Sequence, residues 1–152
     1  MIEQKPAAKT QQTYRLRTAL LSAGRTYRTL AATKADGHGM NVAIKCYAEG
    51  GENEFHAHAR EDHTFVVLQG RAVFQQPNAP NQVLERNGGI LIPAGAFYKF
   101  EAVPGEPLVL LRVGNAYTEG DDRIGLTGAP LPSNSVENKH VVGIPIDGAF
   151  YE

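Results

Sequence analysis

Short runs of apolar and β-branched residues recur from residue 14 to residue 113, and turn-forming residues separate them. Runs of this length, bounded by Gly, Pro, Asn and Asp, are typical of β-strands. Residues 14–21 can also be interpreted as a short helix, and the sequence leaves that alternative open. We predict strands near residues 14–20, 26–32, 41–48, 54–58, 63–69, 72–75, 83–85, 90–92, 97–102 and 108–113.

The segments between these runs have the composition of tight turns. Gly accepts left-handed backbone conformations, and Pro fixes φ at a value that turns use. Many short strands joined by such turns predict an all-β sandwich or barrel. The clearest turn segments are Asp36-Gly37-His38-Gly39, Gly50-Gly51, Asn87-Gly88-Gly89 and Pro104-Gly105.

The two ends of the chain depart from this rhythm, so we divide the sequence into three parts. Residues 1–13 are polar and predict a flexible N-terminal arm, and residues 14–113 predict the barrel. Residues 114–139 are rich in Gly, Pro, Asn, Asp and Ser, which is typical of a lid, a wrapping arm or disorder. Strand character returns at 141–146, so residues 114–152 predict a long loop and a strand-like arm that packs on the barrel or on a second subunit. Two arms that need strand edges predict a homodimer.

Composition and charge narrow the class of protein. The 152 residues fit a single domain with a sizeable core. The net charge is −1, and the 15 basic residues form no stripe, so nucleic acid is not an expected partner. No apolar run approaches the ~20 residues of a membrane span, and the first residues lack the apolar segment of a signal peptide. We expect a cytoplasmic protein that binds a small molecule and neither nucleic acid nor membrane.

Three of the five histidines fall in the run from His56 to His63. Alternate side chains of a strand share a face, so His56 and His58 should project together, with Glu54 on the same face. If residues 59–62 form a hairpin loop, His58 and His63 become cross-strand neighbours with Cβ atoms about 4.5–5.5 Å apart. Metal–nitrogen bonds of about 2.0–2.1 Å then let three imidazoles bind one ion. We favour this metal site over histidines that only pack or form hydrogen bonds.

Other residues with reactive side chains have simpler explanations. His38 and His140 lie in polar segments and should be solvated. Cys46 lies in an apolar run and is expected to be a packed strand residue rather than a nucleophile. Arg112 interrupts the apolar run 108–113, and we favour a surface position at a strand end over a clamp for a substrate carboxylate.

Two segments resemble the motifs of the cupin superfamily, over about residues 40–113. In the first, Gly50 precedes the His56-Ala57-His58 triplet by a fixed gap, and Gly70 closes the next strand. In the second, Asn87-Gly88-Gly89 leads to the turn Pro93-Ala94-Gly95. The resemblance implies a double-stranded β-helix, or jelly-roll, barrel that is often dimeric and holds a divalent transition metal such as Fe, Zn, Mn or Ni.

The chain departs from the cupin pattern at two ligand positions. His63 stands where the family has a metal-binding Glu, and Tyr98 stands where it has a fourth ligand, a His. By position, the resemblance implies the metal ligands His56, His58 and His63.

Further ligands remain open. Glu61 or Asp62 can supply a carboxylate after a shift of one or two residues, which would put Gly70 out of register. Glu54 and Tyr98 are additional candidates as ligands or as neighbours of the ligands. Tyr98 can also be a catalytic proton donor, or simply an aromatic residue lining the barrel.

We therefore predict a metal-dependent enzyme that acts on a small oxygen-rich or carboxylated molecule, with oxygenase and isomerase or lyase chemistry both open. A divalent ion held by neutral histidines keeps its full charge and can polarise a carbonyl, acidify water or, as iron, bind dioxygen. The alternative is a non-catalytic cupin that binds a small ligand or a metal, since Tyr98 replaces a ligand. The third hypothesis is a metal-free structural module, in which the histidines pack or form hydrogen bonds.

Overall fold

The structure of the chain, a computed structural model, describes residues 10–35, 38–115, 122–131 and 142–152. These residues form strands and turns without a helix, which confirms the predicted all-β fold. In these ranges there is accordingly no helix long and apolar enough to cross a membrane. The strands are β1 (Thr18–Ala23), β2 (Arg25–Ala35), β3 (His38–Tyr47), β4 (Gly51–His58), β5 (His63–Gln69), β6 (Ala72–Gln75), β7 (Gln82–Leu84), β8 (Gly89–Ile92), β9 (Tyr98–Ala102), β10 (Leu108–Gly114), β11 (Arg123–Ile124) and β12 (Ile144–Tyr151).

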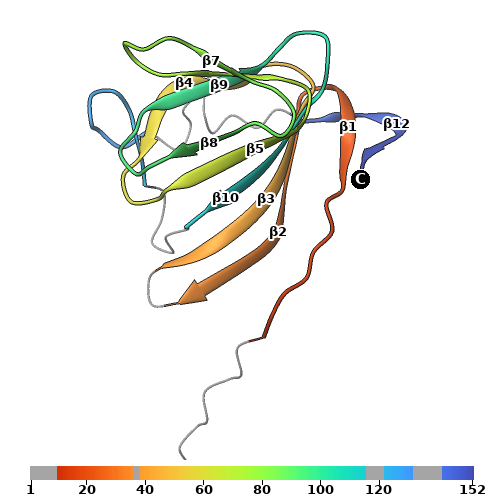
Figure 1. Cartoon of the computed structure of the whole chain (residues 1–152), viewed down its shortest axis with the longest axis horizontal. Helices are drawn as coiled ribbons and strands as arrows, with labels where there is room; N and C mark the ends of the chain where they lie inside the picture. Colours follow the sequence, from red (N-terminus) through yellow and green to blue (C-terminus); the bar gives the residue numbers. More distant parts are fainter. Residues whose placement is uncertain (1–9, 36–37, 116–121, 132–141) are drawn as a thin grey trace, which may run out of the picture.

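Two five-stranded antiparallel sheets face each other and form the body of the molecule (Figure 1). One sheet has the order β2-β3-β10-β5-β8, and the other has the order β11-β4-β9-β6-β7. From β3 to β10 the chain crosses from one sheet to the other at almost every connection, with only β6 and β7 following each other in one sheet. This path is that of a double-stranded β-helix, as predicted.

The predicted hairpin loop at residues 59–62 is wrong. Strands β4 and β5 do not form a hairpin, because β4 pairs with β9 and β11 while β5 pairs with β10 and β8. Residues 59–62 instead carry the chain between the sheets. His58 is opposite Arg123, and His63 is opposite Ile92 on one side and Gly114 on the other. The two histidines therefore approach each other across the interior rather than along one sheet.

Aromatic side chains fill one part of the space between the sheets. Phe65, Phe74 and Phe100 are at most 1% exposed, and the ring centroids of Phe74 and Phe100 lie 4.9 Å apart. Phe74 and Phe100 are opposite each other on β6 and β9, whereas Phe65 comes from the facing sheet. Burying a side chain of this size contributes about 1.5–3 kcal/mol, so this cluster holds the two sheets together.

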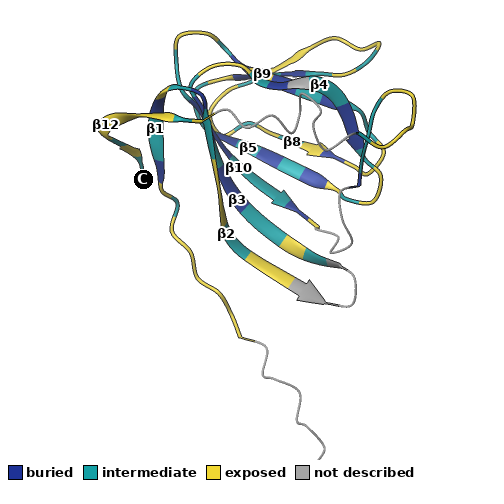
Figure 2. Ribbon diagram, turned by 180° about the vertical axis from the view of Figure 1, so that it is seen from behind, coloured by how far each residue is buried: buried dark blue, intermediate teal, exposed yellow. Residues whose placement is uncertain are grey.

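Strand β10 is buried on both faces, which explains its continuous apolar run. Leu108 and Leu110 belong to the cluster between the sheets, while Val109 packs on the other side against Leu21 of β1 and Cys46 of β3. Buried and half-buried positions accordingly run along β3, β10 and β5 (Figure 2). Cys46 is fully buried, as expected for a packed strand residue.

The C-terminal part of the chain returns to the barrel at two places. Strand β12 pairs with β1, with Thr18 opposite Tyr151, and β11 pairs with β4. Strand β11 was not among the predicted strands. Residues 1–9 of the expected N-terminal arm lie outside the described residues. Because β12 finds its partner within the same chain, the homodimer would need another edge and stays a prediction.

Gly51 begins β4 where the neighbouring strand approaches closely. A Cβ atom at Gly51 would overlap the carbonyl oxygen of Phe100, whereas a Cβ atom at Gly50 would meet nothing within 4 Å. We expect Gly51→Ala to lower the free energy of unfolding by about 3 kcal/mol through overpacking. Gly50→Ala should cost only about 1 kcal/mol, through its left-handed backbone. Urea denaturation measures both, and equal losses would contradict the close approach.

Candidate functional site

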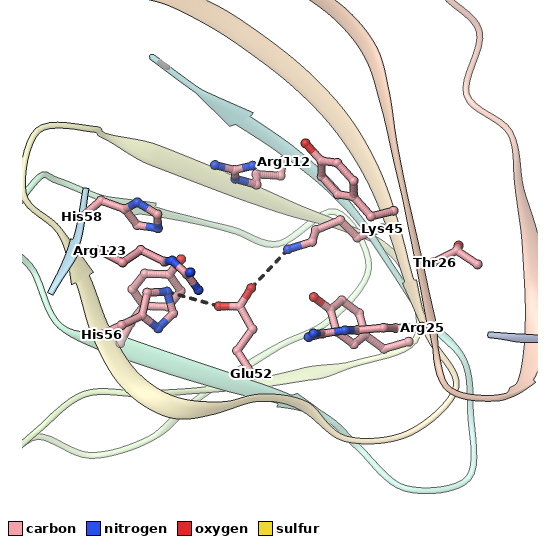
Figure 3. Close-up of a pocket in the computed structure, with 11 residues that line it drawn as sticks. Arg25, Thr26, Lys45, Glu52, His56, His58, Arg112 and Arg123 are labelled. Carbon is pink, nitrogen blue, oxygen red and sulfur yellow. Dashed lines mark hydrogen bonds and ion pairs between the residues drawn. The ribbon is translucent and has the colours of Figure 1, made fainter. Parts of the chain in front are cut away.

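A cavity of about 430 Å³ lies between the sheets, beyond the aromatic cluster. Both sheets contribute to its walls, and charged side chains point into it (Figure 3). The lining residues are Arg25, Thr26, Tyr27, Lys45, Tyr47, Glu52, His56, His58, Tyr98, Arg112 and Arg123.

Strand periodicity places the cations in this cavity. Lys45 and Tyr47 are two residues apart on β3 and share a face, and Arg112 and Leu110 do so on β10. The expectation that Arg112 lies on the surface is wrong, because its side chain is only 15% exposed and lines the cavity. The inward face of β10 therefore changes from apolar at Leu110 to polar at Arg112, where it forms part of the cavity wall.

His58, Glu61 and His63 form a group of metal-ligating side chains, with their donor atoms all within 4.8 Å of one another. The imidazole centroids of His58 and His63 lie 4.0 Å apart. Glu61 Oε2 lies 3.0 Å from His63 Nε2 and 3.8 Å from His58 Nδ1. Glu61 was only an alternative in the sequence, yet it is the carboxylate that the structure brings to these two histidines.

Asp122 holds His58 in position. Its Oδ1 atom lies 2.8 Å from His58 Nδ1, and its Oδ2 atom accepts the backbone N–H of Arg60 at 3.0 Å. A proton on His58 Nδ1 would be donated to Asp122, which leaves the Nε2 lone pair available. A carboxylate that orients an imidazole through its second nitrogen is the arrangement found behind most metal-bound histidines.

The surroundings of His63 Nε2 fit a bound cation. Arg112 Nη2 donates to this atom at 2.8 Å, so Nε2 has no proton for the Glu61 oxygen at 3.0 Å. Burial, and then the Arg112 charge, lower the pKa of His63 to about 2, which keeps the ring neutral. Two ligand atoms at right angles and about 2.1 Å from one ion lie about 3.0 Å apart, so these two acceptors suit a shared metal.

Gly114 makes room for the His63 ring. The two residues are opposite each other on β10 and β5. A Cβ atom on Gly114 would lie 2.8 Å from His63 Cδ2 and 3.2 Å from His63 Nε2. The ring can take its place beside Glu61 because this position of β10 has no side chain.

His56 lies next to His58, with their ring centroids 5.4 Å apart, and it also approaches Glu52. Its Nδ1 atom lies 3.0 Å from the Glu54 carbonyl oxygen, and its Nε2 atom lies 3.4 Å from Glu52 Oε2. Lys45 Nζ donates to Glu52 Oε1 at 3.1 Å. Burial would raise the pKa of Glu52, but the charges of Lys45 and His56 outweigh it and the pKa is lowered. Glu52 is therefore an ionised carboxylate held between two nitrogen groups.

A bulge in β4 explains why Glu52 rather than Glu54 lines the cavity. Glu52 is opposite Phe100 and His56 is opposite Tyr98, so four steps along β4 face two steps along β9. This irregularity breaks the alternation that placed Glu54 beside the histidines. Tyr98 is 3% exposed, and its ring centroid lies 4.5 Å from that of His56.

The two other histidines of the chain are His38 and His140. His38 begins β3, at the far end of that strand from Tyr47. His140 lies outside the described residues. The sequence reasoning missed Glu52, Lys45 and Asp122. Glu52 shares the parity of His56, and Lys45 is a charge within an apolar run, so both carried a signal, whereas Asp122 lies in a loop segment and carried none.

Residues 43–114 match the family model described as Cupin domain. Residues 43–114 therefore form a cupin domain, as the resemblance of the two motifs predicted. No curated protein sequence matches the chain.

Solved structures with low sequence identity share the fold. KdgF from Halomonas sp. is 15% identical with a TM-score of 0.56, over 72% of this chain and 98% of its own. A conserved protein of Klebsiella pneumoniae with a double-stranded β-helix domain is 18% identical with a TM-score of 0.53, over 64% of this chain and 76% of its own. The cupin domain of Schizosaccharomyces pombe Cnp3 is 18% identical with a TM-score of 0.52, over 62% of each chain. These likenesses establish the barrel fold.

The lowered pKa values of His58 and His63 make the metal-free protein sensitive to acid. Burial is the main cause of both shifts. Below about pH 6.5 the unfolded chain binds protons that the folded chain does not, so the free energy of unfolding should fall as pH decreases. We expect a loss of about 1–2 kcal/mol between pH 7 and pH 5.5, measured by urea denaturation with a chelator. His63→Asn should flatten this dependence, and an unchanged slope would contradict the assignment.

Proposed function

We propose that this protein is a metal-dependent enzyme that converts a small oxygen-rich or carboxylated molecule in the cavity between its sheets. The observation that carries the proposal is the group His58, Glu61 and His63, which adjoins a cavity lined with cations. Ligand-binding sites of this kind combine a concave surface with a few convergent polar groups.

The chain's own residues suit a divalent transition metal. His58 would bind through Nε2, because Asp122 occupies Nδ1, and His63 and Glu61 would bind through the two atoms that lie 3.0 Å apart. Two nitrogens and one carboxylate oxygen suit Fe, Zn, Mn and Ni. Such an ion, when bound, supplies Lewis acidity towards a substrate oxygen or, as iron, affinity for dioxygen.

Glu52 and His56 provide a proton acceptor and donor within the same cavity. Glu52 is kept ionised by Lys45, and its Oε2 atom lies 3.4 Å from His56 Nε2. A carboxylate in this position can take a proton from a substrate carbon or hydroxyl group and share it with the imidazole. This pair favours isomerase or lyase chemistry, whereas two histidines with one carboxylate favour an iron oxygenase. Tyr98 remains a candidate proton donor beside His56.

A specific contact supports a second candidate function, that of a non-catalytic binding protein. Arg112 donates to His63 Nε2, so the chain's own cation already satisfies a proposed ligand atom. Tyr98 in place of a fourth imidazole points the same way. In that case the cavity would bind its small molecule without converting it.

Elemental analysis of protein purified without a metal-affinity tag tests the proposal first. We expect near-stoichiometric iron, zinc, manganese or nickel in the wild-type protein, lost in His58→Ala and reduced at least tenfold in Glu61→Gln. Glu54→Gln is the matched control, because Glu54 does not line the cavity, and it should retain the metal. Iron would direct the search to oxygen consumption, and the other metals to isomerase or lyase assays. No metal in any protein, even after reconstitution, would refute the proposal.

Asp122→Asn tests how the metal site is built. Removing the carboxylate that orients His58 should weaken Zn²⁺ binding by roughly 10–100-fold without removing a ligand. Isothermal titration calorimetry on the apo-protein measures this, with the exposed Asp147→Asn on β12 as a control. Equal affinities in the two variants would show that His58 is not a ligand supported by Asp122.

A further inference from the structure

Four cationic side chains converge on one cavity in a chain whose net charge is −1. They come from four different strands: Arg25 from β2, Lys45 from β3, Arg112 from β10 and Arg123 from β11. The side chains of Lys45 and Arg112 are only 14% and 15% exposed. Burying cations is costly unless negative charges lie close to them. Their convergence therefore indicates that the cavity receives an anionic ligand.

Among residues 10–35, 38–115, 122–131 and 142–152, the carboxylates at this cavity number fewer than the cations. Glu52 is the one carboxylate among the lining residues that the structure describes. With Glu61 and Asp122 at the His58 end included, four cations meet three carboxylates and leave one excess positive charge. A divalent ion would raise the excess to three. A ligand with three negative charges would neutralise the loaded site, and one with two would leave a single excess positive charge.

The cations are divided between two ends of the cavity (Figure 3). Arg123 is opposite His58 on the neighbouring strand and lies at the end that contains the metal-ligating group. Arg25 and Lys45 lie across the cavity from His58, on β2 and β3. Cations on opposite walls of the cavity suit an elongated ligand with an acid group at each end.

We infer that the ligand of this cavity is a small dianion, with one acid group held near Arg112 and Arg123 and the other held by Arg25 and Lys45. The inference names the class of ligand for the proposed function. It rests on that function only for the metal, which would lie at the end near Arg112 and Arg123. Arginine binds carboxylate or phosphate oxygens in a bidentate manner, and lysine serves as a point charge. A dicarboxylate and a phosphorylated acid both carry two acid groups of this kind, so both are candidate ligands.

An isosteric series of ligands tests the charge requirement. Succinate carries two carboxylates, succinamate carries one, and succinamide carries none. We expect binding to metal-free and to Zn²⁺-loaded protein, measured by calorimetry, to weaken at least tenfold with each carboxylate replaced. Phosphoglycolate provides the second comparison. Tighter binding than that of succinate would identify the ligand class as a phosphorylated acid, and weaker binding would identify it as a dicarboxylate.

Variants at the end away from the metal-ligating group locate the second acid group. Arg25→Gln should weaken succinate at least tenfold and leave succinamide and the metal content unchanged. Arg28→Gln is the matched control on the same strand, because Arg28 is exposed and donates to the Arg17 carbonyl. The double variant Lys45→Met/Glu52→Gln removes both members of the buried pair, so no charge is left unpaired, and it should also lose succinate.

The outcomes separate this inference from the proposed function. Selective binding of succinate to a protein that never takes up metal would refute the proposed function and leave the inference standing. Metal uptake with equal affinities across the series would overturn the inference alone. Failure of both succinate and phosphoglycolate to bind at concentrations on the order of 10 mM would also overturn it, since a cavity suited to such a ligand should bind it at lower concentrations.

Discussion

The ion pair between Lys45 and Glu52 connects the two sheets at the point where the aromatic core ends and the cavity begins. The two side chains come from β3 and β4, on facing sheets, and their charged atoms lie 3.1 Å apart. Each charge depends on the other, because removing one partner of a buried pair typically costs about 3–5 kcal/mol. The pair also fixes Glu52 beside His56. Stability and the polar chemistry of the cavity therefore depend on the same contact.

The interior of the barrel has one tightly packed aromatic half and one polar half that contains the cavity. Phe65, Phe74 and Phe100 interlock in the closed half, where each ring loses nearly all contact with water. The other half keeps its polar groups because the backbone leaves room for them. Gly114 is the clearest example, since any side chain there would displace the His63 ring. The aromatic half thus holds the strands in the register that brings His58 and His63 together from different sheets.

Period-two patterning and turn residues were sufficient to predict nearly all the strands and the barrel, because both are local consequences of backbone geometry. The site was less predictable. His58 and His63 come together as expected, but through a crossing between sheets that no local pattern specifies. Glu52 and Glu54 have the same parity, but the bulge in β4 leaves only Glu52 in the cavity wall, and the alternation rule cannot anticipate two extra residues in one strand. Asp122 reaches His58 from 64 positions away, so only the tertiary structure reveals it.

The proximity of cations to the metal-ligating group has a thermodynamic consequence. Arg112 lies 2.8 Å from His63 Nε2 and 3.9 Å from Glu61, so its charge opposes any metal ion held by those atoms. An anion that pairs with Arg112 reduces this opposition, and the metal in turn strengthens the attraction for the anion. Binding free energies that are coupled in this way are reciprocal. A cation beside these candidate metal ligands would weaken binding in a metal-storage protein, but it would link metal and anion binding in a protein that uses both.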